Sequence, residues 1–211
     1  MPGKLANLIQ AEVQKGLPGT DYQYRMAPSI RMPVDHVPRD PVDAGVLILL
    51  YPSGQTICTV FIKRADYQGI HSGQISFPGG KSEPADKNII QTAIREAEEE
   101  LGIDLQQIHF TGTLTQLYIP ISNTSVFPVI GYIENIPSFH PDSKEVDYVI
   151  EVVIDELLKP GNVKCSDMEI RSENIRVPYY DISGEHIWGA TAMILSEFIE
   201  IINRCWRTDQ E

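Results

Sequence analysis

Three glutamates, Glu96, Glu99 and Glu100, are spaced so that a helix would bring them to one side. Glu99 and Glu100 follow Glu96 by three and four residues, and side chains at these spacings are neighbours on a helix surface. Like charges in this arrangement destabilise an isolated helix. Such a cluster therefore either remains in water or holds a divalent cation, and clustered carboxylate oxygens suit Mg²⁺ or Mn²⁺.

The residues that precede these glutamates favour the cation over an acidic face that is merely solvated. Gly79 and Gly80 lie upstream, where a backbone carbonyl can complete a metal site. Asp86 precedes the helix, near the positive end of the helix dipole. Arg95 lies within the cluster, where it can pair with a carboxylate and fix its rotamer.

This segment resembles the Nudix box, a glycine–loop–helix signature of hydrolases that act on nucleoside diphosphates linked to another moiety. The usual pattern is Gly, five residues, Glu, seven residues, then Arg-Glu-apolar-any-Glu-Glu-any-Gly-apolar. Gly80 begins the pattern, and residues 95–103 (Arg-Glu-Ala-Glu-Glu-Glu-Leu-Gly-Ile) complete it without a mismatch. Two departures precede this half. Asp86 stands where Glu is usual, and eight residues rather than seven separate it from Arg95.

Both departures are common in the branch typified by coenzyme A pyrophosphatases, and the resemblance extends to that branch. Its Gly-x-x-x-Phe-Pro-Gly-Gly stretch matches residues 73–80, and its Ile-Trp-Gly-x-Thr-Ala element matches residues 187–192. One position differs, because the coenzyme A signature has Arg where this chain has Gly69. The segment 64–66 also matches only loosely. The similarity covers roughly residues 44–200, and Gly69 leaves the coenzyme A specificity open.

The resemblance implies a divalent-metal-dependent hydrolase that cleaves a pyrophosphate bond in a nucleoside diphosphate derivative, with coenzyme A or its thioesters as the leading substrate. It implies Mg²⁺ or Mn²⁺ held by Glu96, Glu99, Glu100 and the Gly79 carbonyl. Glu96 would also orient or deprotonate the attacking water, and Arg95 would orient the carboxylates. Alternative substrates are ADP-ribose, dinucleotides and other nucleotides. A non-catalytic Nudix-fold binding module is a further alternative, which the three retained glutamates disfavour.

A few residues outside the box are further site candidates. In this family an acid from a later loop often takes part, and Glu145, just before an expected strand, is the best candidate. An ordinary acid at a strand edge is the alternative. We expect substrate contacts from Arg64, His71, Phe77 and Gly80. The alternatives are a solvated cation for Arg64 and a structural loop histidine for His71.

The hydrophobic pattern predicts the elements that must position these residues. The expected elements are a helix over 4–15, strands over 46–51, 56–63, 73–77, 109–118, 127–134 and 146–153, a helix over 88–101, a helical turn over 155–158 and a final helix over 188–205. Residues 78–80 are expected to form a turn without regular structure.

Strands dominate, so the fold class is α+β, an α/β/α sandwich. The resemblance implies a Nudix-type mixed β-sheet with a loop-helix-loop catalytic motif. Residues 1–43 are expected to form an N-terminal helix and an extended, proline-rich arm. Residues 44–211 are expected to form the hydrolase domain, including the C-terminal helix.

Composition restricts the partners and the compartment. The chain has 17 Lys+Arg against 29 Asp+Glu, a formal net charge of −12. So acidic a chain is not expected to bind a nucleic-acid polymer. The three cysteines are widely spaced, which disfavours a disulfide framework or zinc site. No apolar run suits a secretory signal or a membrane span. We expect a cytoplasmic protein with a small-molecule partner and no membrane. A homodimer is open by analogy, because dimers are common among Nudix proteins.

Overall fold

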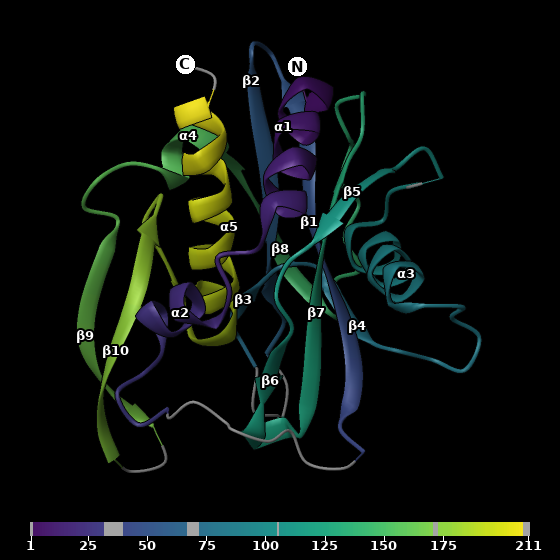
Figure 1. The fold of residues 1–211 in the computed structure, drawn as a ribbon. Coiled ribbons are helices and arrows are strands. Elements are labelled where there is room, and N and C mark those ends of the chain that lie inside the picture. Colours follow the sequence, from purple (N-terminus) through teal and green to yellow (C-terminus); the bar gives the residue numbers. More distant parts are fainter. Residues whose placement is uncertain (1, 32–39, 67–71, 105, 171–172, 209–211) are drawn as a thin grey trace.

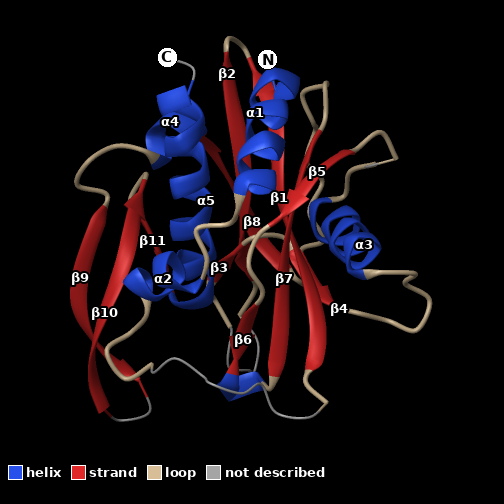
Figure 2. Cartoon of the chain, viewed as in Figure 1, coloured by secondary structure: helices blue, strands red, loops and turns tan. Residues whose placement is uncertain are grey.

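The structure is a computed structural model that describes residues 2–31, 40–66, 72–104, 106–170 and 173–208 (Figure 1). A mixed β-sheet runs through the centre of an α/β/α sandwich, as expected from the sequence (Figure 2). The helices are α1 (Pro2–Lys15), α2 (Thr20–Gln23), α3 (Ile89–Leu101), α4 (Ile154–Leu157) and α5 (Gly189–Thr208), with 3₁₀ turns η1 (Tyr24–Met26) and η2 (Pro120–Ser122).

The central sheet has the strand order β3-β2-β1-β7-β5, with β4 also paired to β1, β6 to β7 and β8 to β2. Its strands are β1 (Val42–Ser53), β2 (Thr56–Arg64), β3 (Ile75–Ser76), β4 (Gly79–Lys81), β5 (His109–Thr113), β6 (Leu117–Ile119), β7 (Thr124–Tyr132) and β8 (Val146–Val153). β1 forms a hairpin with β2 and runs parallel to β7. β1 is therefore the central strand of the sheet, between β2 and β7.

Both faces of β1 are buried, which explains its continuous apolar run. Leu47, Leu49 and Tyr51 belong to a core under α3, whereas Ile48 and Leu50 belong to a core under α1 and α5. Figure 1 shows α3 on one side of the sheet and α1 with α5 on the other. Successive side chains of one strand therefore stabilise opposite layers of the sandwich.

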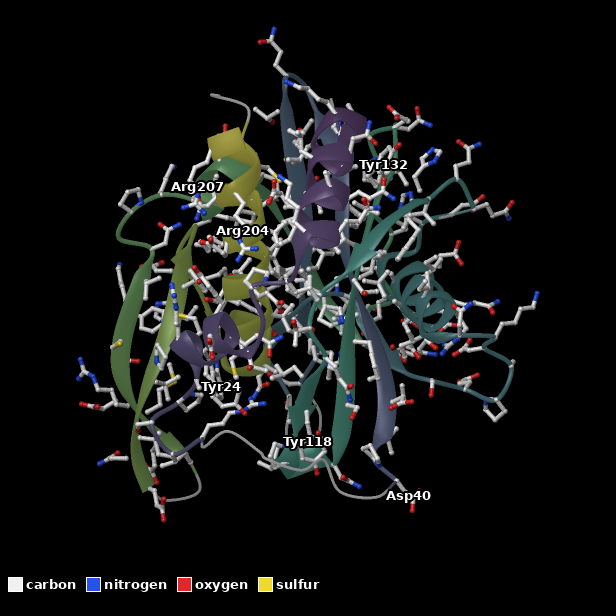
Figure 3. All side chains as sticks on the ribbon, in the orientation of Figure 1. Tyr24, Asp40, Tyr118, Tyr132, Arg204 and Arg207 are labelled. Atoms are coloured by element: carbon white, nitrogen blue, oxygen red, sulfur yellow. The ribbon has the colours of Figure 1, made fainter. Side chains whose placement is uncertain are left out.

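A second, smaller sheet lies beside α5 and was not expected from the sequence. It is an antiparallel meander of β9 (Val163–Ile170), β10 (Glu173–Ile182) and β11 (Glu185–Trp188). β11 leads directly into α5, so this sheet and the last helix form one C-terminal unit. Arg204 projects from α5 (Figure 3). It donates to the Gly16 carbonyl at 2.9 Å, which ties this unit to the end of α1.

Most expected elements are confirmed: the helices over 4–15, 88–101 and 188–205, the hairpin and the strand over 146–153. Three expectations are wrong. Residues 79–81 form strand β4 rather than an irregular turn, because they pair with residues 44–46 of β1. The stretch 109–118 is split between β5 and β6. The arm after Gly16 contains α2 and η1 rather than extended chain alone.

All three cysteines are free: Cys58 and Cys205 are buried and Cys165 is exposed. Burial raises the pKa of the Cys205 thiol to about 12. No helix in the described part of the chain combines the length and apolar character that a membrane crossing requires.

The contact between α3 and β1 depends on Gly45. A Cβ at this position would lie 2.7 Å from the Ile89 carbonyl oxygen and 2.8 Å from the Ala93 nitrogen. Both are backbone atoms of the helix, and neither can move without shifting α3. Glycine at this position thus lets the helix backbone lie directly on the strand.

We therefore expect Gly45→Ala to destabilise the fold by about 1–3 kcal/mol, because the added methyl group must push the helix away from the sheet. Urea unfolding measures the change. The matched control is Gly112→Ala, also in a strand, whose Cβ would meet Val13 only at 3.4 Å. Equal stability of the two variants would contradict the close packing.

Candidate active site

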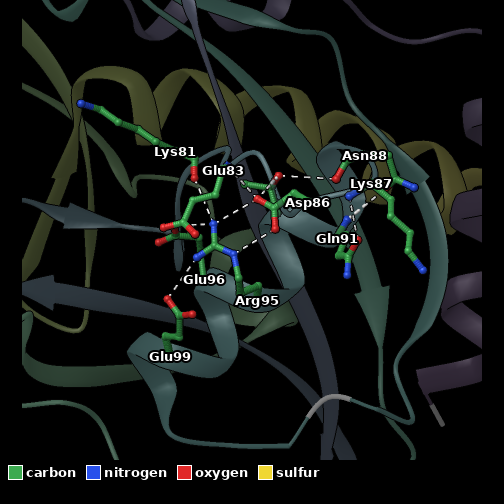
Figure 4. Close-up of polar contacts among 10 residues, drawn as sticks. Lys81, Glu83, Asp86, Lys87, Asn88, Gln91, Arg95, Glu96 and Glu99 are labelled. Carbon is green, nitrogen blue, oxygen red and sulfur yellow. Dashed lines mark hydrogen bonds and ion pairs between the residues drawn. The ribbon is translucent and has the colours of Figure 1, made fainter.

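Helix α3 carries the three glutamates and is fixed at both ends. Asn88 caps its start, accepting from the Gln91 N–H at 3.0 Å, while the Gln91 side chain accepts from the Lys87 N–H at 2.8 Å (Figure 4). These bonds satisfy two N–H groups at the helix start. Gly102 ends the helix in the left-handed conformation at φ 62°, where the His140 backbone lies too close for a Cβ. These contacts fix where α3 begins and ends, and with that the directions in which its glutamates point.

Glu100 is the buried member of the cluster, with 1% of its side chain exposed. Its carboxylate accepts from the Gly79 N–H at 2.7 Å and pairs with Arg64 Nη1 at 3.1 Å. Burial raises the pKa of Glu100 to about 7, opposed by the Gly79 N–H and Arg64 and reinforced by the negative charges of Glu96 and Glu145. This acid thus joins α3 to both β4 and β2.

The pairing of β4 with β1 turns the Gly79 backbone toward α3. Leu47 N donates to the Pro78 carbonyl and Ser82 N donates to the Asp43 carbonyl. Bonded pairs alternate along an antiparallel ladder, so the N–H and carbonyl of Gly79 point away from β1. The N–H meets Glu100, and the carbonyl lies on the same side of the strand. The Gly79 carbonyl, which is the expected metal ligand, therefore accepts no hydrogen bond from β1.

Gly80 leaves room for Glu96. A Cβ on Gly80 would overlap the Glu96 carboxylate, so a larger residue here would displace that side chain from its present position. Glu96 is half-buried, and burial raises its pKa, an effect that Arg95 opposes and that Glu99 and Glu145 reinforce. Gly80 therefore shapes the site through its missing side chain.

Arg95 is the centre of a polar network that ties the preceding loop to the helix (Figure 4). Its guanidinium pairs with Asp86 at 3.0 Å, Glu96 at 2.9 Å and Glu99 at 3.1 Å. It also donates to the Lys81 carbonyl at 3.1 Å. This matches the expectation that Arg95 contacts the carboxylates.

Asp86 is held by several donors at once. Besides Arg95, it accepts from the Glu83 N–H and the Thr92 hydroxyl, both at 2.9 Å. The Arg95 hydrogen bond, followed by that of the Glu83 N–H, holds the pKa of Asp86 well below its usual range. Asp86 thereby closes the loop between β4 and α3.

Glu145 lies in the exposed turn before β8. Its N–H donates to the Asp142 carbonyl at 3.0 Å, and its carbonyl accepts from Ala65 N at 2.9 Å. Its negative charge raises the pKa of both Glu96 and Glu100. The structure thus brings this acid from a distant loop near the box glutamates.

The chemistry of the cluster fits a divalent cation. Five carboxylates gather near two guanidinium groups, and the neighbouring negative charges add to the burial that raises the pKa of Glu96 and Glu100. The five carboxylates are those of Asp86, Glu96, Glu99, Glu100 and Glu145, and the two cations are Arg64 and Arg95. As the side chains stand, no three acidic, His or Cys groups among the described residues converge on one point. Instead, the carboxylates expected to bind the ion are paired with arginines. Arg64 pairs with Glu100, and Arg95 pairs with Glu96 and Glu99.

The other expected contacts differ in outcome. Arg64 is 25% exposed and pairs with Glu100. Phe77 is 2% exposed and packs on Phe61 with ring centroids 4.6 Å apart. The side chain of Phe77 therefore packs in the core, and the expected substrate contact stays a prediction. His71 and Gly69 lie outside the described residues.

Two supporting residues were missed from the sequence. Gly45 sets the distance between α3 and β1, and a lone glycine opening an apolar strand is the signal that indicates close backbone approach. Thr92 closes the Asp86 loop, but a threonine within a helix carries no comparable signal.

Comparison with known proteins places this arrangement in a family. The NUDIX domain model matches residues 41–172. Among similar proteins, the "Uncharacterized Nudix hydrolase NudL" of Pectobacterium atrosepticum is 33% identical over 180 residues, covering 84% of this chain and 89% of that protein. The protein of the same name from Yersinia enterocolitica is 33% identical over 144 residues, covering 67% and 72%.

Solved structures support the same fold. The Nudix hydrolase RenU from M. smegmatis superposes with a TM-score of 0.52 at 15% identity, covering 77% of this chain and 86% of that chain. A MutT/nudix family protein from Enterococcus faecalis gives 0.52 at 14% identity, covering 87% and 73%.

We expect Glu99→Gln to weaken Mn²⁺ binding by at least roughly tenfold, the lower end of the loss typical when a metal site's supporting shell is altered. Glu99 is 58% exposed, so removing its charge should leave the fold intact. Calorimetric titration of the protein with Mn²⁺ measures the affinity. Glu98→Gln, on the same helix but outside the Arg95 network, is the matched control. Unchanged affinity in the Glu99 variant would remove it from the cation site.

Proposed function

The chain belongs to the Nudix family, and from this premise we propose that it hydrolyses the pyrophosphate bond of coenzyme A or its thioesters. At the coarser level it is a Nudix hydrolase that acts on nucleoside diphosphate derivatives. The observation that supports the proposal is the contact of Glu100 with the Gly79 N–H and the close approach of Glu96 to Gly80, with Glu99 joined to Glu96 through Arg95. A non-catalytic module has no need to keep these box carboxylates.

In the proposed reaction, water attacks one phosphorus of the diphosphate. The new P–O bond forms as the bridging P–O bond breaks, and the second phosphate leaves with its substituent. Bound Mg²⁺ or Mn²⁺ would neutralise phosphate charge and acidify water. Glu96, Glu99, Glu100 and the Gly79 carbonyl would hold the cation.

The protein's own residues supply proton transfer and positioning in this proposal. Glu96 or Glu145 accepts the proton of the attacking water at a carboxylate oxygen. Arg64 is partly exposed at the end of β2, and it is the guanidinium placed to meet a phosphate once Glu100 no longer holds it. Arg95 keeps its bonds to Asp86 and to the Lys81 carbonyl, so it stays a positioning residue.

Coenzyme A is proposed over other nucleotides because of the elements flanking the box. Residues 73–80 and 187–192 both match the coenzyme A pyrophosphatase-like branch. Gly69 is the specific observation that keeps a second candidate, because the signature Arg is absent there. That candidate is a hydrolase of ADP-ribose, dinucleotides or another nucleotide.

The proposal includes a cytoplasmic location and a small-molecule substrate rather than a polymer. Three free thiols, one of them exposed, suit a reducing compartment. A homodimer remains part of the proposal by family analogy only.

The substrate proposal predicts that coenzyme A is cleaved with the highest kcat/KM in a panel with ADP-ribose, NADH, diadenosine polyphosphates and nucleoside triphosphates. With Mg²⁺ or Mn²⁺ present, chromatography should show 3′,5′-ADP and 4′-phosphopantetheine as products of coenzyme A. A preparation of Glu100→Gln, expected to lose activity by orders of magnitude, controls for contaminating hydrolases. Preference for another member of the panel would refute the coenzyme A assignment and leave the hydrolase intact.

A further inference from the structure

The first turn of α5 is bonded to the strand that leads into the glycine segment. The Thr191 hydroxyl donates to the Ile75 carbonyl at 2.9 Å, in a buried contact between residues 116 positions apart. Thr191 is 9% exposed and Ile75 is 5% exposed, so water does not readily replace either partner. The bond crosses from the C-terminal unit to β3.

The Ile75 carbonyl depends on this bond because of the sheet register. β3 is an edge strand of two residues whose one neighbour among the described strands of the sheet is β2. Arg64 N donates to the Gln74 carbonyl at 3.0 Å, so the bonded positions alternate and the Ile75 carbonyl points away from β2. Without Thr191 this buried acceptor has no partner from the sheet, and a buried orphan acceptor is costly.

A continuous series of contacts joins Ile75 to the carboxylates. Two residues further on, Phe77 is fixed in the core against Phe61. The Pro78 carbonyl then accepts from Leu47 N at 2.8 Å, and the Gly79 N–H donates to Glu100 at 2.7 Å. A displaced β3 therefore acts on Gly79 across only four residues.

We propose that Thr191 is a positioning residue of the active site, which holds β3 so that the Gly79 N–H meets Glu100 and the Gly79 carbonyl stays on the same side of the strand. Thr191 lies on α5, beyond residues 41–172, the segment matched by the family domain. In this proposal the C-terminal unit therefore helps to position the site. The effect on catalysis rests on the proposed function, whereas the effect on Gly79 does not.

The test compares Thr191→Val, which keeps the shape and removes the donor, with Thr191→Ser, which keeps the hydroxyl. Ser196→Ala is the matched control, because the Ser196 hydroxyl on the same helix also donates to a backbone carbonyl, that of Tyr22, at 2.8 Å. Amide hydrogen exchange over residues 74–80 is measured in metal-free protein, followed by Mn²⁺ affinity and by kcat and KM for coenzyme A.

Thr191→Val should speed exchange in this segment, weaken Mn²⁺ binding and lower kcat by roughly tenfold, with KM nearly unchanged, a size set by one buried hydrogen bond. Thr191→Ser should restore all three, and Ser196→Ala should leave them as in the parent protein. Wild-type exchange and Mn²⁺ affinity in Thr191→Val would overturn the proposal, as would an equal loss in Ser196→Ala.

If Thr191→Val does not fold, Thr191→Ala is measured in its place. If the parent protein leaves coenzyme A intact, the substrate assignment fails, and the exchange and Mn²⁺ measurements still decide the role of Thr191.

Discussion

The closeness of α3 to the backbones of β1 and β4 is the constraint on which the site depends. Gly45 admits the helix onto β1, and Gly80 admits the Glu96 carboxylate onto β4. At this distance Glu100 reaches the Gly79 N–H and satisfies the requirement that a buried carboxylate be hydrogen-bonded. A helix held further out by side chains would leave the amide unpaired and Glu100 in water. Gly45 and Gly80 thus determine how close the glutamates lie to the two strands.

The same closeness concentrates negative charge that the protein alone does not balance. Arg95 is shared among Asp86, Glu96 and Glu99, and Arg64 pairs with Glu100. An anionic diphosphate would be repelled by such a cluster, in a chain that already carries a net charge of −12. A bound divalent cation would reverse the local sign and reconcile an acidic protein with an anionic substrate. Arg95 also pairs with Asp86, so it keeps an acidic partner when the box glutamates bind the cation.

Local signals allowed much of the site to be predicted from sequence. The helix over 88–101 was recognisable from its apolar stripe and from Gly102, and the spacing of the glutamates follows from helix geometry alone. Long-range pairing could not be predicted in the same way. Gly79 and Gly80 have the composition of a turn, and they form a strand only because residues 44–46 pair with them. The meander of β9, β10 and β11 was missed, although Ile175, Val177 and Tyr179 of β10 alternate with less buried residues as in a half-buried strand.

The C-terminal helix shows why the box does not define the site by itself. The family domain matches residues 41–172, yet Met193, Leu195 and Phe198 of α5 are fully buried in the core that covers one face of the sheet. Removing α5 would expose that face and leave the Ile75 carbonyl without its donor. We therefore propose that the hydrolase domain extends beyond the matched segment and includes the C-terminal helix α5. The acids come from the box, but the strand they face is held in place by a helix about a hundred residues later in the chain.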